Sequence, residues 1–170
     1  LEVTLGPGLL SSVYDGLQNN LTTMESVFLK RGEYTDPLDH KKLWDFTPIA
    51  KEGDKVTAAD WLGEVKEGWL PHKIMVPFSF KGEYTVKKIA EAGKYNIDMV
   101  VAVLTGADGE ETYVTMTQKW PVKVAVKAYQ EKPRPQKIME TGVRCIDTFN
   151  PIAEGGTGFI PGPFGCGKTV

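Results

Sequence analysis

Short runs of alternating apolar and polar residues make up most of the chain, and glycines separate them. Between residues 36 and 120 the runs include HKIMVPFSF, GEYTVKKIA, MVVAVLT and TYVTMTQKW. A period of two over so few residues, bounded by turn-forming residues, predicts β-strands rather than helices. The pattern therefore predicts a small all-β domain over residues 36–120.

The stretch KEGDKVTAADWLGEV predicts how these strands pair. It contains a turn at Gly53–Asp54, an inward Val56, a second turn over residues 57–60 and a strand over residues 61–65. Paired hairpins of this kind occur in barrel-sandwich domains that carry biotin or lipoate. Those carriers present a modifiable lysine within Met-Lys-Met or Asp-Lys-Ala, and the sequence has neither tripeptide. We therefore expect no carrier function.

The first 35 residues have a different pattern. LEVTL alternates like a strand, and a Gly-Pro-Gly turn follows it. Leu9, Val13 and Leu17 then recur at helical spacing, which predicts a short amphipathic helix whose apolar face packs in the core.

The last 50 residues begin with PVKVAVKAYQEKPRPQKIMETG, whose prolines indicate a connector rather than a strand or helix. A short helix is predicted next, with Thr141 as its cap and Val143, Ile146 and Phe149 on one side. GTGFIPG predicts a strand that leads into the final loop. This order of elements indicates that the β domain interrupts a larger α/β domain, of which residues 1–35 and 121–170 are the two edges.

The composition of the chain argues against some classes of function. The 170 residues are 41% hydrophobic and 25% charged, as in ordinary globular proteins. A net charge of −2 argues against nucleic acid as a partner. The longest apolar run, Met99–Leu104, is too short for a membrane helix, and no signal peptide opens the chain. We expect reduced Cys145 and Cys166, structural His40 and His72, and four tryptophans that pack in the core or at its edge.

The strongest chemical signal is the final stretch, a complete G-x-x-x-x-G-K-T motif. Its glycines allow backbone torsions in which successive N–H groups point at phosphate oxygens, while the lysine adds positive charge and the threonine hydroxyl binds Mg²⁺. The predicted nucleotide-binding residues are Gly162, Pro163, Phe164, Gly165, Cys166, Gly167, Lys168, Thr169 and Val170. Among these, Lys168 is the predicted catalytic residue and Thr169 the predicted Mg²⁺ ligand.

TGVRCIDTFNPIAEGGTGFIPGPFGCGKTV resembles rotary ATPases, in which a T-G-x-[RK]-x-I-D helix precedes the phosphate loop. Within that superfamily, GPFGCGKT is similar to the loop of the catalytic A subunits of V-type and archaeal-type ATPases and ATP synthases. LGPGLLSSVYDGLQ, LDHKKLWDF, PHKIMVP and MTQKWPV also resemble this subunit. The chain departs from the family pattern at Asn19–Asn20, at residues 125–127, at Asn150 and at Glu154, all outside the loop.

The resemblance implies a mainly β chain, in which a barrel-sandwich-like bulge domain over residues 36–120 is inserted in the edge of a P-loop α/β nucleotide-binding domain. Residues 1–35 would be the N-terminal edge of that domain, and residues 121–170 its start, ending in the phosphate loop. We expect the chain to be a piece of a longer subunit, because the catalytic glutamate and the Mg²⁺-binding acidic strand of the family follow the loop.

The resemblance also implies ATP or ADP and Mg²⁺ as cofactors. It implies B subunits of an alternating A3B3 ring, together with central and peripheral stalk subunits, as partners at the cytoplasmic face of a membrane. The parent enzyme would couple ATP hydrolysis or synthesis to H⁺ or Na⁺ transport, and the piece alone would be inactive. In the alternative, the chain serves as a structural module whose bulge contacts the peripheral stalk.

Overall fold

The computed structural model of the chain describes residues 1–24, 28, 31–32, 34–128, 131 and 134–168. These residues form two compact units, which we call the β unit (residues 1–129) and the C-terminal unit (residues 130–170). Because each unit has its own internal contacts, they are described separately.

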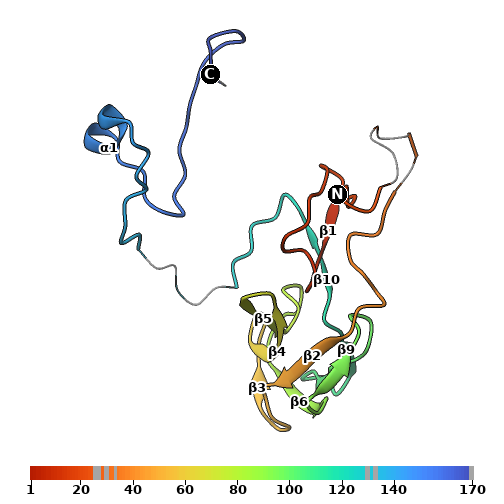
Figure 1. The fold of residues 1–170 in the computed structure, drawn as a ribbon. Coiled ribbons are helices and arrows are strands. Elements are labelled where there is room, and N and C mark those ends of the chain that lie inside the picture. Colours follow the sequence, from red (N-terminus) through yellow and green to blue (C-terminus); the bar gives the residue numbers. More distant parts are fainter. Residues whose placement is uncertain (25–27, 29–30, 33, 129–130, 132–133, 169–170) are drawn as a thin grey trace. The chain divides into compact units, whose positions relative to one another are not determined.

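Two four-stranded antiparallel sheets contain most of the strand residues described in the β unit (Figure 1). The first sheet has the order β5-β4-β2-β7, with bounds Leu70–Met75, Trp61–Glu67, Trp44–Pro48 and Gly93–Tyr95. The second has the order β3-β6-β8-β9, with bounds Lys55–Val56, Tyr84–Ile89, Ala102–Thr105 and Glu111–Val114. Strands β1 (Glu2–Leu5) and β10 (Gln118–Pro121) pair with each other and, among the described strands, with no other. The prediction of a mainly β chain is confirmed.

Alternating burial along the strands produces two apolar clusters. The first core consists of Leu38, Trp44, Phe46, Val65, Ile74, Ile97, Val101 and Met116. The second core consists of Ala50, Val56, Leu62, Val76, Val86, Ala102, Leu104 and Val114. The inward position predicted for Val56 and the strand predicted over residues 61–65 are both confirmed.

Strand β4 contributes to both cores, because Leu62 lies in the second and Val65 in the first. Residues three apart in a regular strand point to opposite faces. The pairing of β4 with β5 shifts register between Trp61 and Gly63. A Cβ added to Gly63 would overlap the ring of Phe46 and lie 2.8 Å from the carbonyl oxygen of Thr47. Only glycine lets β4 approach β2 so closely.

The helix predicted over residues 9–17 is absent from the described residues of this stretch, so that prediction is wrong. Ser11 and Gln18 have φ angles of 63° and 67°, which are incompatible with a right-handed helix. The Asp15 carboxylate instead accepts the N–H groups of Leu17 and Asn19, at 2.8 Å each. Such local hydrogen bonds compete with helix formation. Leu10, Val13 and Leu17 are exposed, while Leu9 packs against the first core.

The C-terminal unit contains helix α1 (Arg144–Phe149), so the predicted short helix is confirmed. Its predicted cap is wrong, because Val143 occupies the N-cap position and no side chain caps it. The strand predicted at GTGFIPG is also wrong, since residues 156–162 form no strand. No side chain described between residues 134 and 168 is buried. The α/β sheet expected around this segment is not among the described residues.

The tryptophans and histidines differ in their surroundings. Trp44 is buried in the first core and Trp120 is half-buried, as predicted, whereas Trp69 is 87% exposed and contradicts the prediction. Trp61 is largely exposed beneath the Lys73 ammonium group.

Both histidines bind carboxylates: His72 contacts Glu67, and His40 contacts Asp36 and Asp98.

None of the helices described is long and apolar enough to cross a membrane.

The close approach at Gly63 predicts that Gly63→Ala destabilises the β unit strongly. A methyl group would displace the buried Phe46 ring, and overpacking of this kind costs about 1–3 kcal/mol. Gly16→Ala is the matched control, because a Cβ there meets nothing within 4 Å. Urea unfolding should show a lower midpoint for Gly63→Ala than for Gly16→Ala, and equal midpoints would contradict the packing argument.

The His40 ion pairs predict a pH-dependent contribution to stability. Its ring nitrogens lie 2.7 Å from Asp98 and 2.9 Å from Asp36, and the pKa of His40 is raised, first by the hydrogen bond to Asp98. A raised pKa means that the stabilisation is complete below the unfolded value of about 6.5 and disappears as pH rises through the folded value. Solvent around this half-exposed ring keeps the effect below about 1 kcal/mol.

His40→Gln should therefore lower the unfolding midpoint at about pH 5.5 and have little effect at about pH 9. The check is a series of urea titrations of both proteins across this range. A difference that stays constant with pH would show that the ion pairs do not stabilise the fold.

Candidate nucleotide site

The loop over residues 162–168 has the backbone torsions that its glycines allow. Gly165 and Gly167 have φ angles of 80° and 81°, a region that other residues rarely adopt. The Cys166 N–H donates to the Pro163 carbonyl oxygen at 3.3 Å, which closes a turn within the loop. Left-handed residues between ordinary ones let neighbouring N–H groups point into one concavity, which is how backbone binds anions.

Lys168 folds back over the beginning of this loop. Its Nζ donates to the carbonyl oxygens of Gly162, at 2.5 Å, and Pro163, at 3.1 Å. The ammonium charge therefore lies at the loop itself. Both acceptors are neutral carbonyls, and an anion at the same place would make a stronger, charge-assisted hydrogen bond with this lysine.

Gly162 is required by a contact across the loop. A Cβ at this position would overlap the Cys166 sulfur, so a side chain would displace the thiol. Cys166 is a free, exposed thiol, as is Cys145. Residues 162–168 thus form a loop with one closed turn, in which Gly162, Gly165 and Gly167 satisfy steric requirements. Phosphate binding by this loop stays a prediction. Thr169 and Val170, predicted to bind Mg²⁺ and nucleotide, lie outside the described residues.

Asp147 holds together the segment before the loop, a role that the sequence analysis did not predict. Its carboxylate accepts hydrogen bonds from the Thr141 hydroxyl at 2.6 Å, the Thr141 N–H at 3.1 Å and the Gly142 N–H at 3.0 Å. The hydroxyl contributes most to a lowered pKa of Asp147. Thr141 and Asp147 stand six residues apart in TGVRCID, the signal that would have predicted the contact.

Backbone hydrogen bonds close the same segment at its base. The Met139 N–H donates to the Ile152 carbonyl at 2.7 Å, and the Glu154 N–H donates to the Lys137 carbonyl at 3.0 Å. Residues 137–154 therefore form a closed loop that carries α1 and leads toward the glycine-rich stretch.

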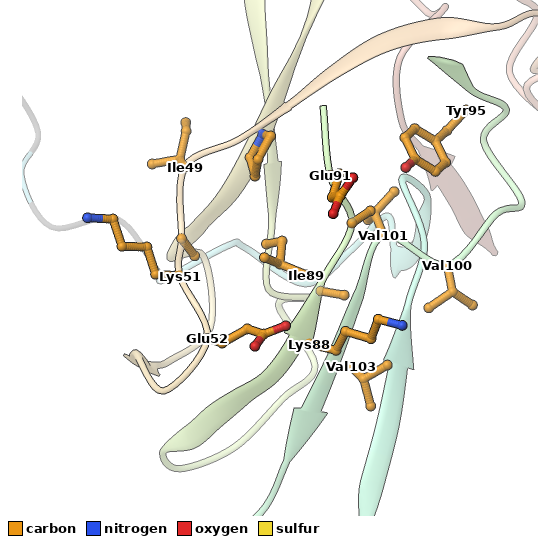
Figure 2. Close-up of a pocket in the computed structure, with 14 residues that line it drawn as sticks. Ile49, Lys51, Glu52, Lys88, Ile89, Glu91, Tyr95, Val100, Val101 and Val103 are labelled. Carbon is orange, nitrogen blue, oxygen red and sulfur yellow. The ribbon is translucent and has the colours of Figure 1, made fainter. Parts of the chain in front are cut away.

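The β unit contains an open hollow of about 890 Å³ that shows no comparable chemistry (Figure 2). It lies between the stretches 48–52, 88–91 and 100–103, and most of its lining is aliphatic. Lys51 extends away from the other labelled side chains in Figure 2. Two lysines and two glutamates line the hollow, so its charged side chains balance. Over the described part of the chain, no three His, Cys, Asp or Glu residues are grouped to hold a metal ion.

Comparison with known proteins gives the family. The model of the ATP synthase alpha/beta subunit barrel-sandwich domain matches residues 35–123, which include both sheets of the β unit. The chain belongs to this family. The barrel-sandwich architecture expected from the hairpins is thereby confirmed.

Relatives extend the similarity over the whole chain. V-type ATP synthase alpha chains of Borrelia turicatae and Chlamydia abortus are each 50% identical to it, and that of Treponema denticola is 49% identical. All of this chain is covered in each case, so the similarity includes the glycine-rich loop as well as the barrel-sandwich domain. The chain spans only about 30% of the length of these relatives. The predicted resemblance to the alpha chain (A subunit) of V-type ATP synthases is confirmed.

Proposed function

We propose that this chain is part of the catalytic, nucleotide-binding subunit of a V-type ATP synthase or ATPase. The enzyme would couple ATP hydrolysis or synthesis to transport of H⁺ or Na⁺ across a membrane. The observation that carries this proposal is the loop at residues 162–168, where two left-handed glycines and a folded-back lysine occur in a chain that resembles V-type alpha chains.

Each residue of the loop has a physical role in this proposal. Backbone N–H groups of Gly162 and of residues 164–168 would hold the phosphates of ATP or ADP, and Lys168 would turn from its two carbonyl acceptors to the β- and γ-phosphates. The Thr169 hydroxyl and Val170 would complete the site. Thr169 would be a ligand of Mg²⁺, and the ion would neutralise part of the phosphate charge.

The proposed domain layout follows the sequence prediction. Residues 36–120 would be the inserted bulge domain, and residues 1–35 and 121–170 would belong to a P-loop α/β domain. B subunits of an A3B3 ring and stalk subunits would be its partners at the cytoplasmic face of the membrane. The three large apolar side chains of Phe159, Ile160 and Phe164 are all exposed within six residues, and apolar groups gathered in this way support a surface that the rest of a domain or a neighbouring subunit would cover.

A second candidate is a structural module without activity of its own, whose bulge would contact the peripheral stalk. One observation favours it for the 170-residue chain. The β unit has two apolar cores, whereas the described residues 134–168 bury no side chain and give the loop no packed support. Ordering such a loop around a ligand costs conformational entropy.

Lys168→Ala tests the proposed catalytic role in the assembled enzyme. Electrostatic stabilisation and positioning carry most of phosphoryl transfer, so ATP turnover should fall by at least ~10²-fold. The exposed lysine packs against no core, so assembly should remain intact. Lys137→Ala, another exposed lysine of the same unit, is the control and should keep its turnover. An ATPase rate near that of the unmodified enzyme for Lys168→Ala would refute the role.

Cys166 offers a test that separates the two candidates. In the assembled enzyme, bound ATP should cover the loop and slow alkylation of Cys166 by at least about 10-fold. Cys145 is also exposed and lies outside the loop, so its labelling serves as the internal control. Quantitative mass spectrometry of both thiols gives the answer. If ATP leaves the rate at Cys166 unchanged, the loop does not hold nucleotide and the structural module is favoured.

A further inference from the structure

Strand β5 (Leu70–Met75) forms an edge of the first sheet and, in the part of the chain that the structure describes, pairs only with β4 (Figure 1). An edge strand has backbone N–H and C=O groups without a strand partner, and proteins usually blunt such edges by short length or by charge. The other edge strands follow this rule. β3 has two residues, β7 has three, and β9, with four, begins at the exposed Glu111. β5 has six residues.

The outer edge of β5 is identified by its backbone. Directly after the strand, the Val76 N–H donates to the carbonyl oxygen of Asp60, the residue before β4, at 2.9 Å. Because the N–H groups of successive residues alternate between the two edges of a strand, those of Met75 and Lys73 face away from β4. Pro71 shares this outer edge, where its missing N–H breaks no bond with β4. The surface available for pairing therefore lies beyond Pro71.

The polar side chains of β5 leave this edge unguarded. Nζ of Lys73 contacts the Glu64 carboxylate and lies 4.8 Å from the centre of the Trp61 ring, so the lysine is held against β4. Nδ1 of His72 lies 2.7 Å from Oε2 of Glu67, which is also on β4. A charged side chain that extends freely from an edge strand is a usual obstacle to pairing with a further strand. Here both polar side chains are bound to the neighbouring strand instead.

An apolar hollow of about 290 Å³ runs along the same edge. Five of the six β5 residues line it, and segments 5–10 and 115–118 contribute to its other walls. Leucine, isoleucine, methionine and phenylalanine make up more than half of the lining residues. Among the residues that line it, Glu67 is the one carboxylate, and its Oε1 already accepts the N–H groups of Gly8 at 2.6 Å and Leu10 at 3.1 Å. The hollow therefore suits an uncharged side chain.

Two exposed apolar residues lie at this hollow. Trp69, in the hairpin turn before β5, is 87% exposed, and Leu10, which lines the hollow, is 45% exposed. Large side chains beside a pocket are typical of contacts in which a few residues carry most of the binding energy. The volume is at the lower limit of ligand pockets, which hold about 300–1,000 Å³, so one or two apolar side chains would fill it.

We propose that β5 binds an extended peptide segment of another protein as an added strand. The peptide backbone would pair with the outer N–H and C=O groups of Lys73 and Met75, and one apolar side chain of the peptide would enter the hollow. In this mode of recognition, main-chain hydrogen bonds give the affinity and the pocket for a side chain gives the specificity. The site lies within the barrel-sandwich domain and does not depend on the glycine-rich loop.

An NMR titration of the 170-residue chain with the capped heptapeptide Lys-Thr-Val-Thr-Leu-Thr-Lys tests this site. The peptide has two apolar side chains on one face, and main-chain pairing should give a Kd of about 1 mM or lower. Binding should slow amide hydrogen exchange at Lys73 and Met75 by at least about 10-fold. Tyr113 on the edge strand β9 is the internal control, and its exchange should not change.

Two N-methylated forms of the peptide distinguish strand pairing from simple apolar contact. Methyl groups on alternate backbone nitrogens block one edge of the peptide, so one set should weaken binding at least about 10-fold and the other set should not. Leu10→Ser should weaken binding at least about 3-fold, whereas Leu17→Ser, at an exposed leucine outside the hollow, should not.

Three results would overturn the proposal. The first is unchanged exchange at Lys73 and Met75 with about 5 mM peptide, well above the expected Kd. The second is equal binding of the two methylated forms, which would show that no strand is added. The third is equal affinity of the Leu10→Ser and Leu17→Ser variants, which would show that the hollow takes no side chain of the peptide.

Discussion

Packing of the Phe46 ring against the backbone of Gly63 is the contact on which the β unit depends. β4 belongs to the first sheet and contributes side chains to both apolar clusters, Leu62 to the second core and Val65 to the first. Regular alternation along β4 points Leu62 into the second core and Val65 into the first. Glu67, on the same face as Val65, is buried at the end of the strand. From there its carboxylate holds the segment after β1.

The sequence predicted the structure correctly where contacts between residues close together in the chain determine the conformation. The turn at residues 57–60 and the strand after it were predictable because Asp60 accepts a hydrogen bond from Thr57 within the turn. The helix at Arg144–Phe149 was predictable from its spacing. The glycine-rich loop was recognisable from the sequence because its backbone needs positive φ angles, which glycine adopts readily. Gly165 and Gly167 have such angles.

Predictions failed where distant groups decide the conformation. The spacing of Leu9, Val13 and Leu17 suits a helix, but Gln18 is held by Thr4, 14 residues away, with a left-handed φ. Glu67 looks like an ordinary surface carboxylate in the sequence, and its donors at Gly8 and Leu10 lie 57 to 59 residues away. A one-dimensional pattern contains no information about such partners. Trp69 was misjudged for the related reason that tryptophan at a hairpin turn has no neighbour to cover it.

We propose that residues 162–170 hold the phosphates of a nucleotide in a V-type catalytic subunit. An electron cryo-microscopy structure of the assembled enzyme with Mg-ADP bound is the most direct test of this role. Phosphate density is expected within hydrogen-bonding distance of the loop N–H groups, with Nζ of Lys168 moved from the Gly162 and Pro163 carbonyls to a phosphate oxygen. Nucleotide bound elsewhere, with Lys168 still on those two carbonyls, would contradict it.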